Sequence, residues 1–118
     1  MPHSQPTEHE LLKQSLEPLL EDFQYWFARS RALLESETLS FLSSEEQAQL
    51  LERVNKSQQE VSTAQMLFKA TGGQAGIEGS MLVTWHQLVR ECWKVAMRWR
   101  SLKGDSSIAG SAPPEPKF

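Results

Sequence analysis

The 118-residue chain has few of the features that mark exported, membrane-spanning or disulfide-bonded proteins. Its one cysteine, Cys92, cannot form an internal disulfide, so an oxidising compartment is not required. No apolar run approaches the roughly 18 residues that suggest a transmembrane helix. The first ten residues, MPHSQPTEHE, are polar and acidic and resemble neither a secretory signal nor an Arg-rich transit peptide. These absences favour a cytoplasmic protein.

Proline is scarce along most of the chain, and sustained strand-like alternation is absent. Pro18 is the only proline between Thr7 and Ala112. The length allows one small domain, and a hydrophobic content of 39% excludes a fully disordered chain. We therefore predict an all-α fold, an elongated antiparallel three-helix bundle. The predicted organisation is a flexible N-terminus at 1–6, a helical domain at 7–104 with helices at about 7–37, 44–71 and 80–103, and a disordered tail at 105–118.

Local signals set these helix boundaries. The pairs Thr7–Glu10 and Ser43–Glu46 are spaced as capping boxes. Gly72 or Gly73 can adopt the left-handed conformation that ends a helix. Pro18 either kinks the first helix or divides it, and the kink is preferred because the apolar stripe keeps its phase across the proline. That stripe comprises Leu12, Leu16, Leu19, Leu20, Phe23, Trp26, Phe27, Ser30, Leu33 and Leu34.

The second helix carries glutamines within its apolar stripe. Apolar or Gln residues at positions 51, 54, 58, 61, 65 and 68 alternate in steps of three and four, which is coiled-coil-like spacing. Gln58 and Gln65 either set the register of the bundle or mark an interhelical edge that reaches solvent, and both interpretations stay open.

The third helix holds three of the four tryptophans and five of the twelve basic residues. One arc of it is predicted to be core. Arg90, Lys94 and Arg98 form a basic row on the opposite face, and Trp93 with Met97 forms a shoulder between the two. The shoulder is either ordinary packing or a partner contact, and the row is either a solvated face or a docking surface. The core arc comprises Trp85, Leu88, Val89, Cys92, Val95, Ala96 and Trp99.

Tyr25 lies opposite the stripe of the first helix. It is either an ordinary exposed aromatic or, with Trp26 and Arg29, a second contact or dimer patch.

Charge is distributed unevenly along the chain: residues 1–46 carry nine acidic and three basic residues, whereas residues 80–104 carry five basic and one acidic. The overall charge of −3 and the shortness of the basic row argue against nucleic-acid binding.

No catalytic, metal or cofactor motif stands out. The histidines lack paired ligand spacing, and Cys92 falls in the predicted core rather than beside an activating base. The stretch GGQAGIEG lacks the Lys and Ser/Thr of a phosphate-binding loop and follows a helix, not a strand. We therefore expect no cofactor, no metal and no enzyme activity.

Two segments, LLEDFQYWFARSRALLESE (19–37) and ECWKVAMRWR (91–100), resemble a family of short cyanobacterial proteins that form an all-helical domain of unknown function. The similarity covers about residues 10–100 and rests on aromatic-rich helices. It implies a cytosolic or thylakoid-associated protein, and it implies no activity, cofactor or site residue.

The residues thus favour a non-enzymatic helical interaction module, an assembly or regulatory adaptor. The predicted partner-binding residues are Arg90, Trp93, Lys94, Met97, Arg98 and Tyr25, facing an acidic protein partner. The alternatives are a homo-oligomeric structural protein and a protein bound peripherally to an anionic membrane surface.

Overall fold

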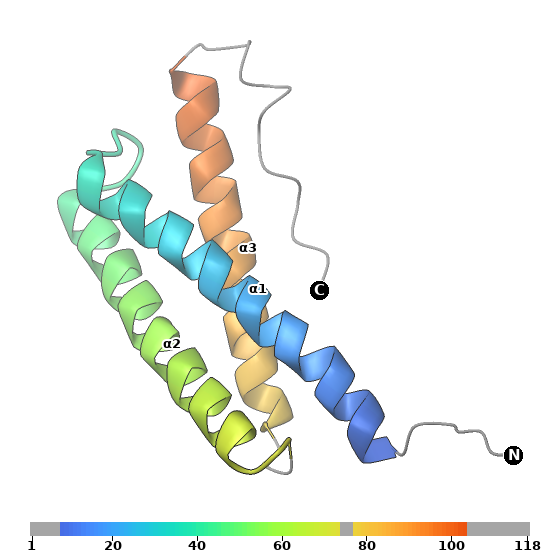
Figure 1. Ribbon diagram of the computed structural model, residues 1–118. Coiled ribbons are helices and arrows are strands. Elements are labelled where there is room, and N and C mark those ends of the chain that lie inside the picture. The colour runs from blue at the N-terminus through green and yellow to red at the C-terminus, as the bar shows by residue number, and fades with distance from the viewer. Residues whose placement is uncertain (1–7, 74–76, 104–118) are drawn as a thin grey trace, which may run out of the picture.

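Three α-helices make up the computed structural model, which describes residues 8–73 and 77–103 (Figure 1). They are α1 (Glu8–Ser36), α2 (Ser44–Ala70) and α3 (Gly79–Leu102), and no strand occurs within the described ranges. The predicted all-α bundle is confirmed, with each helix end within one residue of its predicted position. Its elongated shape is also confirmed, with extents of 59 × 30 × 20 Å.

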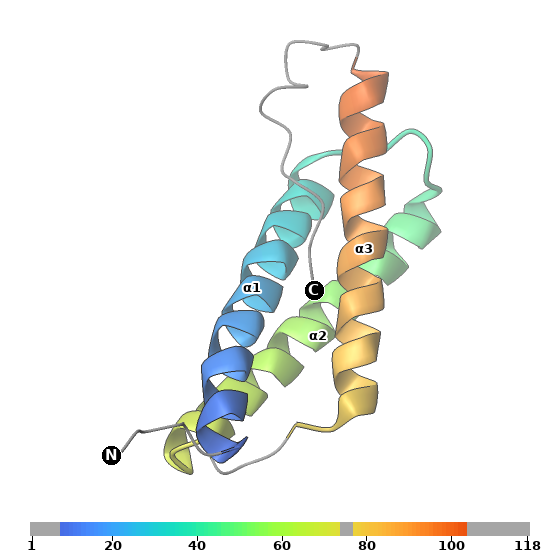
Figure 2. The same cartoon turned by 90° about the vertical axis from the view of Figure 1, so that its right-hand side faces the viewer.

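Consecutive helices run in opposite directions, and α1 packs against both α2 and α3 (Figure 1). In the turned view α3 runs alongside α1 in the same direction, while α2 lies at an angle to both (Figure 2). The predicted N-terminal flexible segment, the Thr7 cap and the C-terminal tail all lie outside the described residues.

The ends of α2 follow the sequence signals closely. Ser43 and Glu46 form a complete capping box, with each side chain accepting a hydrogen bond from the backbone N–H of the other. At the other end Gly72 and Gly73 both have positive φ, at 64° and 87°. The amides of these glycines donate to the carbonyls of Lys69 and Phe68, which is the Schellman pattern. Both glycines therefore terminate the helix together.

Pro18 lies inside α1, which continues through it from Glu8 to Ser36. The proline is exposed, so its ring faces solvent rather than the bundle. The alternative of two separate helices is therefore wrong. The stripe that keeps its phase across Pro18 explains this, because packing of Leu20, Phe23 and Phe27 continues the helix past the missing hydrogen bond.

One polar side chain closes the turn between α1 and α2. The Gln47 Nε2 group donates to the carbonyls of Leu34 and Glu37 at 2.9 and 2.7 Å, and its Oε1 accepts from the Leu39 amide at 3.0 Å. Carbonyls in the last turn of a helix have no partner within the helix, so Gln47 satisfies two groups that the fold would otherwise leave open. Leu39 is fully buried beneath this arrangement.

The core centres on Trp85 of α3, which has no exposed surface. Its ring meets Phe23 of α1 edge-on, with centroids 5.6 Å apart, and Phe23 stacks with Phe27. The indole Nε1 donates to the Glu60 carboxylate of α2 at 3.1 Å. One side chain therefore joins all three helices.

Polar contacts complete the seams around this core. Gln24 of α1 donates to the Gln58 carbonyl at 3.1 Å and to the Ser62 hydroxyl at 2.8 Å. Its Nε2 also lies 3.4 Å from Oε1 of Gln65. On another side, Arg53 of α2 forms a two-pronged ion pair with Glu91 of α3, at 3.0 and 2.9 Å. Both members of that pair are about half exposed, so it adds little stability.

The three described helices differ from membrane-spanning helices. None of them combines the length and the apolar character that crossing a bilayer needs.

Trp85→Phe should lower the free energy of unfolding by about 2 kcal/mol. The change removes the indole hydrogen bond to Glu60 and part of a fully buried ring. Urea denaturation followed by circular dichroism measures the loss. Trp99→Phe is the matched control and should cost clearly less, because Trp99 is only half-buried. Equal losses in the two variants would contradict the central role of Trp85.

Gln47→Glu should lower the free energy of unfolding by about 2 kcal/mol at neutral pH, because a carboxylate has no proton to donate to the carbonyls of Leu34 and Glu37. The deficit should shrink below pH ~4, where the carboxyl group gains a proton. Gln49→Glu, an exposed position in the same turn of α2, controls for the added charge and should be close to neutral. Equal effects at the two positions would disprove the capping role.

Candidate functional site

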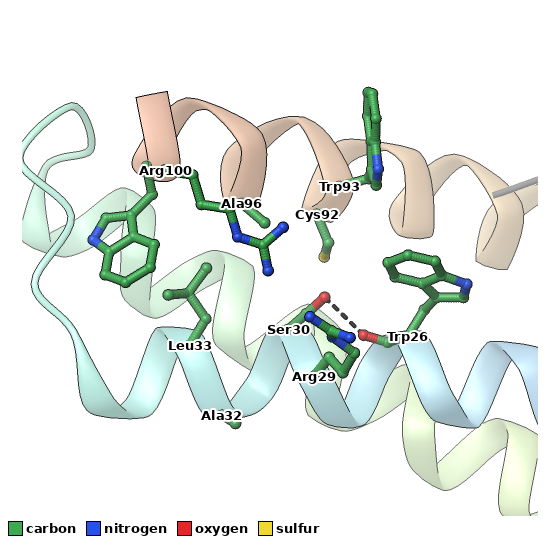
Figure 3. Close-up of a pocket in the computed structure, with 10 residues that line it drawn as sticks. Trp26, Arg29, Ser30, Ala32, Leu33, Cys92, Trp93, Ala96 and Arg100 are labelled. Atoms are coloured by element: carbon green, nitrogen blue, oxygen red, sulfur yellow. Dashed lines mark hydrogen bonds between the residues drawn. The ribbon is translucent and has the colours of Figure 1, made fainter. Parts of the chain in front are cut away.

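A groove of about 290 Å³ lies between α1 and α3 and is open on one side (Figure 3). Its apolar surface exceeds its polar surface, and it draws side chains from the C-terminal halves of both helices. The lining residues are Trp26, Arg29, Ser30, Ala32, Leu33, Cys92, Trp93, Ala96, Trp99 and Arg100.

Side-chain size explains why the groove exists. Near Trp85 the space between α1 and α3 is filled by large rings. Further along the two helices the wall includes Ala32 from α1 and Ala96 from α3. Ala96 carries only a methyl group between the two helices and leaves the space beside it unfilled, whereas Ala32 is exposed and points away from α3 (Figure 3). The result is a hollow beside a well-packed core.

Three of the four tryptophans line this hollow, and all three are partly buried. Trp26 rises from α1 towards α3 at one end of it, and the Trp93 ring projects from α3 on the side away from α1 (Figure 3). Trp99 also lines it, and the Lys103 ammonium sits 4.3 Å from the Trp99 ring centroid. Rigid aromatic rings that are half covered in the free protein can bury their remaining area against a ligand at little conformational cost.

Two arginines give the groove a positive charge. The Arg29 Nη1 donates to the Tyr25 hydroxyl at 2.7 Å, and its guanidinium lies 5.6 and 6.0 Å from the ring centroids of Tyr25 and Trp26. The Arg100 guanidinium extends from α3 into the groove (Figure 3). Its Nη1 is buried and has no hydrogen-bond acceptor among the described residues.

Neither groove arginine is neutralised within 8–73 and 77–103. Ion pairs of the described residues include Arg31 with Glu35 and Arg53 with Glu91, neither of which involves a groove arginine, and no acidic residue lines the groove. Two cationic groups therefore border an apolar hollow without a counter-charge from the described part of the protein.

Cys92 and Ser30 also line the groove. Burial raises the pKa of the Cys92 thiol to about 11, and a hydrogen bond with Ser30 partly opposes that rise. The Ser30 hydroxyl itself donates to the Trp26 carbonyl at 2.8 Å (Figure 3). A thiol with a raised pKa is a poor nucleophile, so Cys92 is poorly suited to covalent chemistry.

The structure separates the residues that the sequence grouped. Trp93 lines the groove, whereas Met97 and the row Arg90, Lys94 and Arg98 are not part of its lining. Arg98 instead places its guanidinium 4.8 Å from the ring centroid of Phe41, in the connection between α1 and α2. Lys94 is exposed, and Arg90 and Met97 are half-buried.

Tyr25 is 53% exposed and adjoins the groove through two of its lining residues. Its ring packs edge-on against Trp26 at 5.5 Å, and its hydroxyl accepts from Arg29. Tyr25, Trp26 and Arg29 therefore contact one another, and whether they bind a partner or a second copy stays a prediction. They form a continuous patch, here called the Tyr25 patch, that extends the groove along α1.

Part of the predicted core arc is not core. Trp85, Leu88, Val89 and Cys92 are buried, but Val95, Ala96 and Trp99 are only half-buried. The reason is that α3 packs chiefly against α1, so the second half of its apolar arc has no third helix to cover it. Sequence spacing pointed to Trp93 as the surplus aromatic, whereas Trp99 belongs to the same surface.

Sequence reasoning also missed the pairing of Arg29 with Arg100. A partial signal was available, because Arg100 follows Trp93 by seven positions and Ala96 by four and so shares their side of α3. Nothing in the spacing placed that side against Arg29.

No group of three or more potential metal ligands occurs among the described residues.

Comparison with known proteins identifies a family but no activity. Residues 6–101 match the family described as "Protein of unknown function (DUF2605)", and the chain belongs to that family. The predicted membership of a domain family of unknown function is thereby confirmed. No curated protein and no solved structure matches the chain.

Cys92 should react slowly with iodoacetamide in the folded protein. At pH 8 a pKa of about 11 instead of 9.0 leaves roughly one hundredth as much thiolate, and burial restricts access further. Alkylation followed by mass spectrometry should therefore run at least about 100-fold slower than in the chain unfolded by guanidinium. A folded protein that reacts as fast as the unfolded one would show that the groove floor is open to solvent.

Proposed function

We propose that this member of the DUF2605 family is a non-enzymatic helical interaction module, an assembly or regulatory adaptor that docks a protein partner in the groove between α1 and α3. The observation that carries the proposal is the gathering of Trp26, Trp93 and Trp99 around an uncovered hollow. Tryptophan and arginine are the side chains most enriched at the energetic centres of protein interfaces.

The surroundings of the groove support a protein partner over a small ligand. Pockets for small molecules bury most of the ligand's surface, whereas this groove is open on one side. It also continues into the Tyr25 patch, which enlarges the available contact along α1. Both features suit a segment of another protein laid along the two helices.

The positive charge supports an acidic partner. Arg29 and Arg100 lie at the groove itself, and the exposed Lys94 and Arg98 raise the potential of the surrounding surface of α3. Such a field speeds the encounter with an acidic surface and makes the association sensitive to salt. The basic row thus attracts the acidic partner towards α3, while the groove makes the direct contact.

We further propose that the protein is located in the cytoplasm of a cyanobacterium. The alternative location is the thylakoid surface. The resemblance of the two aromatic-rich segments supports this setting. The charge distribution supports attraction to an anionic surface as well as to an acidic protein. Vesicle flotation at low salt separates these two, since a protein-only contact leaves the chain with the unbound fraction.

The proposal predicts that Trp93→Ala abolishes capture of the partner. Tagged wild-type and variant chains are used to capture proteins from a cyanobacterial lysate at low and moderate salt, followed by mass spectrometry. Loss of one of the three groove tryptophans should lower retention at least about tenfold. The enriched partner should also weaken at moderate salt.

Met66→Ala provides the matched control, because Met66 is 69% exposed on α2 and lies outside the groove. It should capture the partner as wild type does, and circular dichroism should show unchanged helicity in both variants. Equal capture by Trp93→Ala and wild type would refute the groove as the docking site. Recovery of the tagged chain with copies of itself alone would favour a homo-oligomer, which light scattering would then measure.

A further inference from the structure

We infer that the groove recognises a carboxylate of its protein partner through Arg100, beside the apolar side chain that fills the hollow. This inference rests on the proposed function and names the chemistry of the occupant. The partner segment would carry an Asp or Glu next to an aromatic or aliphatic anchor.

The direction of the Arg100 side chain is the first step. Arg100 lies in the last turn of α3, where a cation is already favoured by the helix dipole. Side chains on a helix tilt toward its N-terminus, which carries the guanidinium back over the preceding turn. The small Ala96 occupies that turn and leaves room for it. The charged group consequently lies in the groove, not beyond the helix end (Figure 3).

The second step is the unmet hydrogen bond. Nη1 of Arg100 is buried and has no acceptor among the described residues. A guanidinium carries five donors in a planar fork, and a buried donor without an acceptor costs stability. A carboxylate entering from the open side would meet this donor and the positive charge together. No other oxyanion found in protein segments matches the fork as well without modification.

The third step is that no acidic side chain of the groove competes with a ligand for the two arginines. The groove lining contains no acidic residue, and neither Arg100 nor Arg29 belongs to an ion pair formed within the described ranges. Arg29 is held by the Tyr25 hydroxyl and by two aromatic rings, so its position at the groove is fixed before any ligand arrives. It adds attraction for an anion from the opposite wall (Figure 3). The tryptophans limit solvent access, which strengthens such a charge-assisted bond.

The chain offers a direct test through its four indole N–H signals in nitrogen-15 NMR spectra. Trp26, Trp93 and Trp99 line the groove, while Trp85 is buried in the core with its Nε1 bonded to Glu60 and serves as an internal control. The probes are 3-phenylpropionate and its neutral counterpart 3-phenylpropanamide, which share an aromatic body and differ in charge. Single Trp→Phe variants assign the signals.

We expect the carboxylate to shift the three groove signals, to leave the Trp85 signal in place and to bind roughly tenfold more tightly than the amide. In Arg100→Met the affinity for the carboxylate should fall to that for the amide. Lys94→Met removes the same charge from an exposed position of α3 outside the groove and should keep the preference. Circular dichroism and thermal melting show whether each variant folds.

Equal binding of the two probes to the wild-type chain, or a preference that survives in Arg100→Met, would overturn the inference. A partner whose capture is lost with Trp93→Ala but undiminished with Arg100→Met would also overturn it while leaving the proposed function intact. A carboxylate preference that depends on Arg100, with no protein captured, would refute the protein occupant and with it the proposed function. The site would then belong to a small carboxylate ligand.

Discussion

The contact of Trp85 with its two neighbouring helices is the interaction on which the rest of the structure depends. The Trp85 ring packs on Phe23 of α1, and its N–H is bonded to Glu60 of α2. Because α1 makes the main contacts with both other helices, this side chain is a rare direct link between α3 and α2. Its ring and its N–H thereby hold α3 against both other helices at one level of the bundle.

The same arrangement leaves part of α3 uncovered. Once Trp85 is seated, Leu88, Val89 and Cys92 pack inward, but the following turns extend along α1 without a third helix opposite them. The aromatic groove is a consequence of a two-helix contact at a place where a three-helix contact would have filled the space. This groove leaves a partly exposed aromatic surface, which the folding of the bundle does not need. The surface contains Trp93 and Trp99, with Arg29 and Arg100 beside them.

The residues of α3 that form the core and those that line the groove are therefore largely different. The core positions of α3 are fully enclosed, and the polar seams at Gln24 and Gln47 satisfy backbone and side-chain groups around them. The groove residues are only partly enclosed and contribute less to folding. A surface of this kind can change with the partner while the bundle beneath it stays the same.

Periodicity and end signals were enough to predict the elements. The apolar stripe of α1 predicted a helix that continues through Pro18, and the Ser43–Glu46 box and the glycines at 72 and 73 predicted both ends of α2. These features are local, because capping and phase involve residues within one or two turns of one another. The surplus of aromatic residues in α3 was visible for the same reason.

What the tertiary structure decided is which surfaces of the helices meet. A helical wheel treats an apolar arc as buried along its whole length, so it placed Trp99 in the core and grouped Trp93 with Arg90, Lys94 and Arg98. Burial depends instead on whether a second helix lies opposite each turn. Arg29 and Arg100 are far apart in the chain and come to line one groove only because α1 packs against α3, and the hydrogen bonds of Gln47 form only when α2 folds back against the end of α1. The sequence by itself determined three amphipathic helices and their ends, and only their packing decided where the groove lies and which charges border it.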